Sequence, residues 1–122
     1  MGHTPHDTGR RGEDIAASYL IDNGYAIITR NYRCPYGEVD IIARDKDEIV
    51  FIEVKSKRVQ DFGDPLEAVD ARKQRTLSKV ALCYLNEEDL VHCNARFDVV
   101  SIYFSYKEPS IELVENAFEL AF

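Results

Sequence analysis

The chain has 122 residues, the length of one domain, and its 45% hydrophobic content is ordinary for a folded protein. No apolar stretch approaches the roughly 18 residues that suggest a membrane span, and the polar residues 1–11 lack the apolar segment of a secretory signal. Three widely spaced cysteines are a poor disulfide framework. We therefore expect a cytoplasmic protein with a single domain over residues 10–122, preceded by a disordered leader over residues 1–9.

The net charge of −7 argues at first against a nucleic-acid partner, because Lys and Arg carry phosphate binding. The charge is unevenly distributed, however. Residues 1–79 hold 13 Lys and Arg against 14 Asp and Glu, whereas residues 80–122 hold 2 against 8. The first two thirds of the chain can therefore present a basic face, although a solvated acidic C-terminal third explains the asymmetry simply.

The first predicted element is a helix over residues 12–23, where apolar residues recur at helical spacing and Gly24 follows as a C-terminal stop. Residues 25–32 are rich in β-branched and aromatic side chains, which predicts a strand. After a turn marked by Pro and Gly, further strands are predicted over residues 38–44 and 48–55, and the short connection between them favours an antiparallel hairpin. Most positions of the third strand are apolar, which predicts burial on both of its faces.

A second helix is predicted over residues 64–85, because it opens with an Asp cap, a proline at the first helical position and a capping-box glutamate. Residues 96–104 predict a fourth strand, and residues 111–114 a short fifth one. The predicted order is therefore αβββαβ with one further strand, an α/β fold.

Three charged residues of the predicted hairpin fit a catalytic metal site. Side chains two residues apart on a strand share a face, so Glu53 and Lys55 project together. Asp40 comes within reach of Glu53 if the register brings them level. Two carboxylates suit a hard cation such as Mg²⁺, which activates water, while a lysine orients that water and stabilises the charge of the transition state. Spacing alone fits equally well with a surface ion pair between Glu53 and Lys55 and a turn capped by Asp40.

Further charged residues flank this centre. Glu13 is expected near the edge of the buried face of the first helix. Lys73 falls within the apolar stripe of the second helix, where its stem either covers apolar surface or points at the same polar centre. Neighbouring basic side chains either contact phosphates or are simply solvated; they are Lys57, Arg58, Arg72, Arg75 and Lys79. The nucleic-acid-binding residues that we predict are Lys57, Arg58, Arg72 and Lys73.

The same residues match the D…(D/E)-x-K pattern of the PD-(D/E)xK nuclease superfamily, since Asp40 is followed thirteen residues later by Glu53-Val54-Lys55. More specifically, the chain resembles the YraN family of small, mostly bacterial proteins. The resemblance extends from about Gly9 to Phe118 and rests on an ordered set of motifs: Gly12-Glu13, Arg30-Asn31-Tyr32-Arg33, Phe51-Ile-Glu-Val-Lys55, Gly63-Asp-Pro65, Arg96-Phe97-Asp98-Val99-Val100 and Asn116-Ala117-Phe118.

The resemblance implies a restriction-endonuclease-like αβββαβ core, with a mixed central sheet flanked by helices, as in archaeal-type Holliday junction resolvases. It also implies the site residues. The catalytic set becomes Glu13, Asp40, Glu53 and Lys55, and Mg²⁺ (or Mn²⁺) is held by Asp40, Glu53 and the backbone carbonyl of Val54. Val39 stands where the superfamily has its proline, which has no ligand role.

The function implied by the resemblance is a Mg²⁺-dependent endonuclease that hydrolyses DNA phosphodiester bonds, including those of branched or single-stranded DNA. No membrane partner is expected. A homodimer is a further prediction, because two active sites would cut the two strands of a junction. Net acidity leaves two other hypotheses open: a non-catalytic nucleic-acid-binding or adaptor module that retains the nuclease fold, and a protein-interaction domain.

Overall fold

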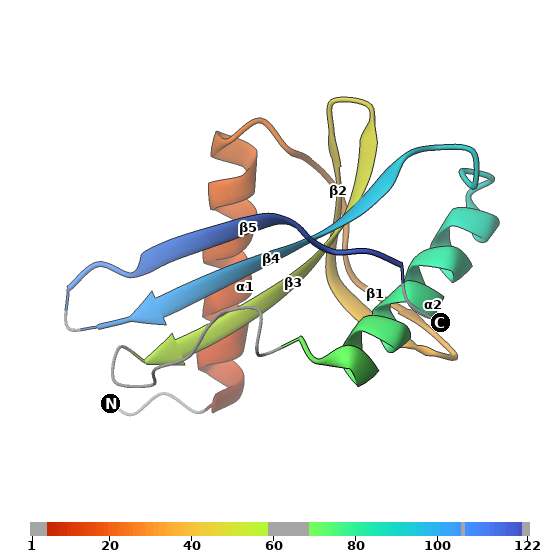
Figure 1. The fold of residues 1–122 in the computed structure, drawn as a ribbon. Helices are drawn as coiled ribbons and strands as arrows, with labels where there is room; N and C mark the ends of the chain where they lie inside the picture. Colours follow the sequence, from red (N-terminus) through yellow and green to blue (C-terminus); the bar gives the residue numbers. More distant parts are fainter. Residues whose placement is uncertain (1–4, 59–68, 106, 121–122) are drawn as a thin grey trace.

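The computed structural model describes residues 5–58, 69–105 and 107–120. These residues form seven elements in the predicted αβββαββ order (Figure 1). The elements are α1 (Pro5–Asp22), β1 (Ala26–Cys34), β2 (Gly37–Asp45), β3 (Glu48–Arg58), α2 (Ala71–Glu87), β4 (Ala95–Phe104) and β5 (Ser110–Phe118). No helix in the described ranges is long and apolar enough to cross a membrane.

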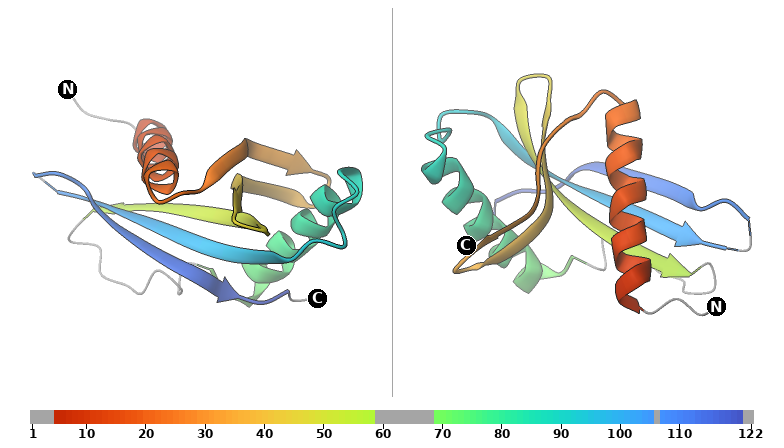
Figure 2. Two further views of the ribbon diagram at one scale, coloured as in Figure 1. Left: turned by 90° about the horizontal axis from the view of Figure 1, so that it is seen from above. Right: turned by 180° about the vertical axis from the view of Figure 1, so that it is seen from behind.

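The five strands form one mixed sheet in which the spatial order follows the chain order, β1-β2-β3-β4-β5. Successive strands pair antiparallel except β3 and β4, which are parallel and are joined through α2. Helix α1 covers one face of the sheet and α2 covers the other (Figure 2). The predicted α/β fold, a mixed central sheet flanked by helices with an αβββαβ core, is confirmed.

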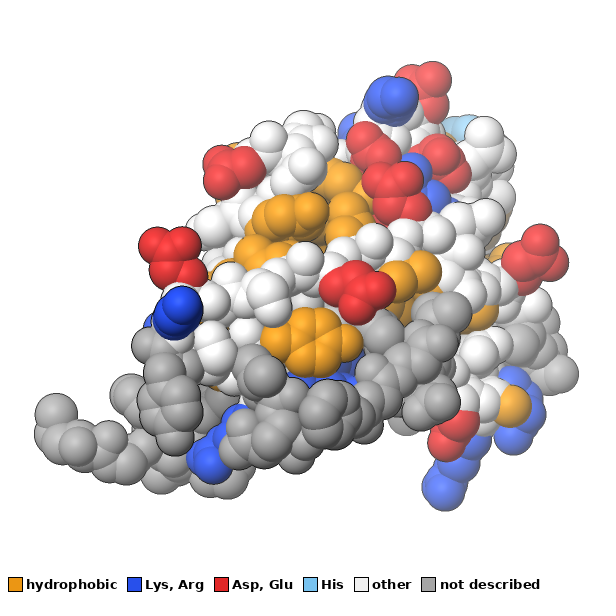
Figure 3. Space-filling model, turned by 60° about the vertical axis from the view of Figure 1, so that its left-hand side comes forward, with side chains coloured by type: hydrophobic (Ala, Val, Ile, Leu, Met, Phe, Trp, Pro, Cys, Tyr) orange, Lys and Arg blue, Asp and Glu red, His pale blue; other side chains and the backbone are white. Residues whose placement is uncertain are grey.

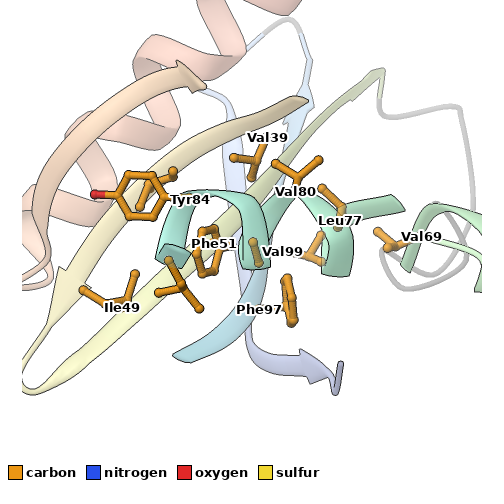
Figure 4. Packing of buried hydrophobic residues seen from close by; sticks show 12 residues of the cluster. Val39, Ile49, Phe51, Val69, Leu77, Val80, Tyr84, Phe97 and Val99 are labelled. Atoms are coloured by element: carbon orange, nitrogen blue, oxygen red, sulfur yellow. The ribbon is translucent and has the colours of Figure 1, made fainter. Parts of the chain in front are cut away.

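Two hydrophobic clusters lie on opposite faces of the sheet, and β3 contributes to both. Ile49 and Phe51 pack on the α2 face, whereas Val50 and Ile52 pack on the α1 face. Figure 4 shows the cluster on the α2 face. Here the Tyr84 ring of α2 packs edge-on against the Phe51 ring, with 5.9 Å between the ring centroids. The predicted burial of β3 on both faces is therefore confirmed.

Helix α1 begins at Pro5, seven residues before the start predicted from the sequence. Residues 5–9, which were predicted as part of a leader, are therefore helical. The prediction was wrong there because it relied on apolar residues recurring at helical spacing, and the polar residues before Gly12 offer no such signal.

Helix α2 begins at Ala71, later than predicted. Its N-cap is Asp70, whose side chain accepts a hydrogen bond of 2.9 Å from the backbone N–H of Lys73. The capping residues that the sequence suggested, Asp64, Pro65 and Glu67, lie outside the described residues.

Strand β5 is longer than the predicted residues 111–114 and extends to Phe118. The pairing of β4 with β5 shifts between Phe97 and Val99, and Asn116 has a left-handed backbone with φ of 51°. Such a bulge interrupts the alternation by which strands are recognised in a sequence, and the predicted strand ended before it.

Candidate active site

Strands β2 and β3 separate at the predicted site, and the register there places Asp40 opposite Glu53. The last ladder pair is Ile41 with Ile52, so Asp40 and Glu53 are the first residues beyond it. At this point the Asp40 side chain replaces a main-chain acceptor, since the backbone N–H of Val54 donates a hydrogen bond of 2.8 Å to its Oδ2 atom. The sequence left open whether the register would bring the two carboxylates level. In the structure the two residues are level.

The Glu53 carboxylate is buried between two lysines. Its side chain is only 7% exposed, and its Oε1 atom lies 3.3 Å from Nζ of Lys55 and 3.5 Å from Nζ of Lys73. Lys73 reaches it from α2, so this lysine points at the polar centre and does not merely cover apolar surface. The ion pair between Glu53 and Lys55 exists, but burial of the carboxylate distinguishes it from an ordinary surface pair.

Asp40 lies within electrostatic reach of the other carboxylates. Burial, and next the negative charge of Glu53, raise the pKa of Asp40 from 3.8 to about 7. The Val54 amide and the charge of Lys55 lower this pKa, whereas the charge of Glu13 raises it. At neutral pH the Asp40 carboxyl is therefore poised between its protonated and charged forms, and an added positive charge would favour the charged one.

Glu13 reaches the site from α1, where its side chain is 14% exposed. Its Oε1 atom lies 3.0 Å from Nε of Arg30 and accepts a hydrogen bond of 2.9 Å from Nδ2 of Asn31. Asn31 lies between the ladder pairs Arg30–Ile41 and Tyr32–Val39, which places it opposite Asp40. Arg30 and Asn31 therefore fix the Glu13 side chain against β1, the strand that pairs with β2 beside Asp40.

Neither Arg30 nor Asn31 had a role predicted from the sequence. A signal was present, because Asn is depleted in strands, yet Asn31 stands within a run of β-forming residues. Its backbone φ of 56° lies in the left-handed region, which Asn tolerates better than most residues.

Helix α1 approaches β3 very closely at Gly12. A Cβ atom at this position would overlap the Ser56 hydroxyl and would lie 3.2 Å from Cβ of Ser56. Gly12 therefore permits the close helix–strand contact that positions the neighbouring Glu13 over the sheet.

The basic residues predicted to contact nucleic acid flank this centre. Lys57 is two residues beyond Lys55 on β3 and is half-buried, and Arg58 follows it at the exposed end of the strand. Arg72 is exposed in the first turn of α2, next to Lys73. On the face drawn in Figure 3, most acidic side chains lie around an exposed hydrophobic patch, whereas Lys and Arg side chains lie both along the lower edge and among the acidic ones at the top.

The donor atoms at the site match the preference of a hard divalent cation. Asp40 and Glu53 offer carboxylate oxygens. The N–H and C=O of one strand residue lie on the same edge, so the Val54 carbonyl shares the edge that faces Asp40. Mg²⁺ takes one or two carboxylates and keeps several waters. This set fits, although no group of three or more His, Cys, Asp or Glu side chains in the described ranges is arranged to hold a metal ion.

The fold and the site define an α/β protein with a five-stranded mixed sheet between two helices, and with two acidic residues and a lysine at the point where β2 and β3 separate. The model of the family described as "Uncharacterised protein family UPF0102" matches residues 12–102. The chain belongs to this family, which is the YraN family that its motifs indicated.

Relatives within the family match almost the whole chain. A UPF0102 protein of Syntrophus aciditrophicus is 51% identical over 115 residues, which cover 94% of this chain and 91% of the relative. A UPF0102 protein of Geobacter sulfurreducens is 51% identical over 93% of this chain and 90% of its own. One from Moorella thermoacetica is 44% identical over 97% of this chain and 100% of its own.

Solved structures show a more distant similarity. One, the structure of an EndoMS–dsDNA complex, has a TM-score of 0.43 and 24% identity over 70% of this chain and 34% of that one. Another, Pyrococcus furiosus SfsA in complex with Ca²⁺, has a TM-score of 0.41 and 14% identity over 88% of this chain and 61% of that one. The chain thus spans about a third of the EndoMS chain.

Proposed function

We propose that this protein is a metal-dependent endonuclease that hydrolyses phosphodiester bonds of DNA, including branched or single-stranded DNA. The observation that supports it is the convergence of Asp40, the buried Glu53 and Lys55 where β2 and β3 separate. Carboxylates and a lysine in one place serve this reaction, because it requires an activated water and stabilisation of negative charge on the phosphate.

Each residue has a role in this proposal. Asp40, Glu53 and the Val54 carbonyl would hold Mg²⁺ or Mn²⁺, which supplies an activated water and a Lewis acid when bound. The ammonium of Lys55 orients the attacking water and stabilises charge on the phosphate. Lys73, which pairs with Glu53, contacts a phosphate oxygen of the substrate once its partner engages the cation. Glu13 adds negative charge beside Asp40, which favours cation binding.

The test is cleavage of labelled duplex, single-stranded, flap and four-way-junction DNA, in Mg²⁺, in Mn²⁺ and in chelator. Glu53→Gln protein, purified identically, controls for contaminating nuclease and retains the size of the side chain. Glu108→Gln is the matched control, because Glu108 is exposed, close to the end of β4. We expect cleavage that requires the metal, persists in Glu108→Gln and is lost in Glu53→Gln. Cleavage that survives in Glu53→Gln would refute the proposal.

One observation favours a second candidate, a non-catalytic nucleic-acid-binding or adaptor module. Both Lys55 and Lys73 already neutralise Glu53, so the buried carboxylate is balanced without a metal ion. In this case DNA binding would be unchanged by chelator and by Asp40→Ala, and no substrate would be cut. The same set of substrates, assayed for binding and for cleavage, separates the two candidates.

A further inference from the structure

The turn between β1 and β2 presents an exposed aromatic ring. Cys34 pairs with Gly37 in the ladder, so the turn consists of Pro35 and Tyr36. Tyr36 is 60% exposed, which is more than any other large hydrophobic residue among those the structure describes. Packing within this chain therefore does not explain why an aromatic residue stands at this position.

The turn that carries this ring is held firmly against α2. A Cβ atom on Gly37 would lie 2.9 Å from Cγ2 of Thr76 and 3.6 Å from Cγ2 of Val80, so the backbone of the hairpin rests directly on the helix. Arg33 and Glu38, on either side of the turn, form an ion pair at 2.8 Å. A ligand of Tyr36 would therefore meet a preformed surface and would not have to order a loop.

The turn that carries Tyr36 is only a few residues from the proposed active site. Tyr36 precedes Asp40 by four residues, which corresponds to roughly 13 Å along a strand. On α2, Thr76 follows Lys73 by three residues, or about 4.5 Å along the helix axis, and Lys73 contacts Glu53. Because successive stacked bases are about 3.4 Å apart, this backbone spacing corresponds to a few nucleotides between the turn and Asp40.

A basic stripe on α2 borders the same turn. Arg72, Arg75 and Lys79 recur at helical spacing and are all exposed. From Ala71 to Asn86 the helix carries no acidic residue, in a chain whose net charge is −7. Together with Lys73, these side chains present positive charge from the proposed site to the turn, as a phosphate backbone requires.

We propose that Tyr36 is a base-stacking residue, which binds an unpaired base of a DNA strand whose phosphates lie along the basic stripe of α2. Aromatic rings beside a positive surface bind single strands in this way, because every unpaired base offers a π-face. The bases of an intact duplex are already stacked on each other. The inference rests on the proposed function and narrows its substrate to DNA with unpaired bases a few nucleotides from the scissile phosphate.

The test measures binding in chelator, so that cleavage plays no part. The full-length chain is titrated into labelled single-stranded, flap and duplex DNA, and into a single strand that carries 2-aminopurine. The variants are Tyr36→Ala, Tyr36→Phe, which retains the ring, and Val91→Ala, a matched truncation of another exposed apolar side chain. Melting curves check that each variant is folded, as expected for exposed positions.

We expect Tyr36→Ala to bind single-stranded and flap DNA roughly tenfold more weakly and to lose the change in 2-aminopurine emission that the unmodified protein produces. Duplex binding should not change, and Tyr36→Phe and Val91→Ala should behave like the unmodified protein.

Equal binding by Tyr36→Ala and the unmodified protein would overturn the stacking role and leave the proposed nuclease intact. A uniform loss on duplex and single strand would also overturn it, as would a Tyr36→Phe variant that binds as weakly as Tyr36→Ala. If the unmodified protein binds none of these DNAs in chelator, the stacking role is overturned. If it also cleaves none of them in Mg²⁺ or Mn²⁺, the proposed function fails as well.

Discussion

The backbone N–H of Val54 donates a 2.8 Å hydrogen bond to the carboxylate of Asp40, so a side chain of β2 occupies the place of a main-chain carbonyl in the sheet. This substitution lets β2 diverge from β3 without leaving the Val54 amide unsatisfied, which would be costly in a half-buried strand. The same carboxylate is thereby fixed opposite Glu53. One hydrogen bond thus both ends the β2–β3 ladder and orients a proposed metal ligand.

Stability should depend on pH through Asp40. Its pKa is raised from 3.8 to about 7, so folding favours the protonated form. The stability that this group contributes is fully present below pH 3.8 and is lost as the pH rises through about 7. Asp40→Asn cannot acquire the charge, so in chelator it should exceed the unmodified protein in stability at pH 8. Each pKa unit corresponds to about 1.4 kcal/mol, so the difference in stability between the two proteins at pH 8 should not exceed roughly 4 kcal/mol.

Urea denaturation at pH 5 and pH 8 measures this difference, which should be smaller at pH 5. Mg²⁺ should then stabilise the unmodified protein at pH 8 and have little effect on Asp40→Asn, because a bound cation replaces the proton. An Asp40→Asn protein that is less stable than the unmodified one at pH 8 in chelator would contradict the assignment of burial and Glu53 as the main causes.

Asn31 combines a backbone role with a side-chain role, and two substitutions separate them. Asn31→Gly keeps the left-handed backbone at φ of 56° but removes the hydrogen bond to Glu13. Asn31→Ala loses both, so it should be less stable than Asn31→Gly by about 1 kcal/mol. Both variants should bind Mg²⁺ more weakly, as measured by the stabilisation that the metal produces at pH 8. Unchanged stabilisation by Mg²⁺ in both variants would show that the position of Glu13 does not matter for metal binding.

The order of the elements and the antiparallel hairpin that carries the two carboxylates could be predicted because they depend on local patterns. The short turn between β2 and β3 predicts an antiparallel hairpin, which the structure confirms, whereas the register that brings Asp40 level with Glu53 was left open. The buried character of β3 likewise follows from its unbroken apolar run. These features need only neighbouring residues, so the sequence displays them.

Features that depend on contacts distant in the sequence could not be predicted in this way. The partnership of Asn31 with Glu13 joins β1 to α1, and the approach of Lys73 to Glu53 joins α2 to β3. The sequence allowed Lys73 two orientations, and only the packing of α2 on the sheet selects one. The start of α1 was missed for another reason, since polar residues extend a helix without adding to its apolar stripe.

Gly12→Ala should destabilise the protein although alanine is the better helix former. The added methyl group would overlap the Ser56 hydroxyl, and α1 would have to move away from β3. Such overpacking typically costs roughly 1–3 kcal/mol. Combining it with Ser56→Ala should recover part of the loss, because it removes the closest atom. Ser18→Ala, at an exposed position of the same helix, is the control for helix propensity and should be neutral or slightly stabilising. A Gly12→Ala protein as stable as this control would refute the close contact.

Asp98 should be among the residues on which stability depends most strongly. It is 1% exposed and accepts hydrogen bonds from the Tyr25 hydroxyl at 2.8 Å and from the backbone N–H of Asn116 at 2.9 Å. It also pairs with Arg96 at 3.1 Å, so it ties β4 to β5 and to the residue before β1. Removal of one partner from a buried pair typically costs roughly 3–5 kcal/mol, and Asp98→Asn should fall near the lower limit because its amide retains one acceptor. Glu115 also faces Arg96 at 3.9 Å and accepts a hydrogen bond of 3.1 Å from the Tyr25 hydroxyl, but its side chain is 59% exposed.

Glu115→Gln is therefore the matched control, and its cost should not exceed about 0.5 kcal/mol, because exposed ion pairs contribute little. Denaturation of both variants at pH 7 makes the comparison. Equal losses of stability in the two variants would mean that the interactions of Asp98 are no more important than those of the exposed Glu115. In that case β4 and β5 would be held together by apolar packing and backbone hydrogen bonds alone. A large loss confined to Asp98→Asn would instead show that the buried polar cluster of Asp98, Arg96 and Tyr25 holds β4 and β5 together next to Ile52, the last residue of β3 that pairs with β2.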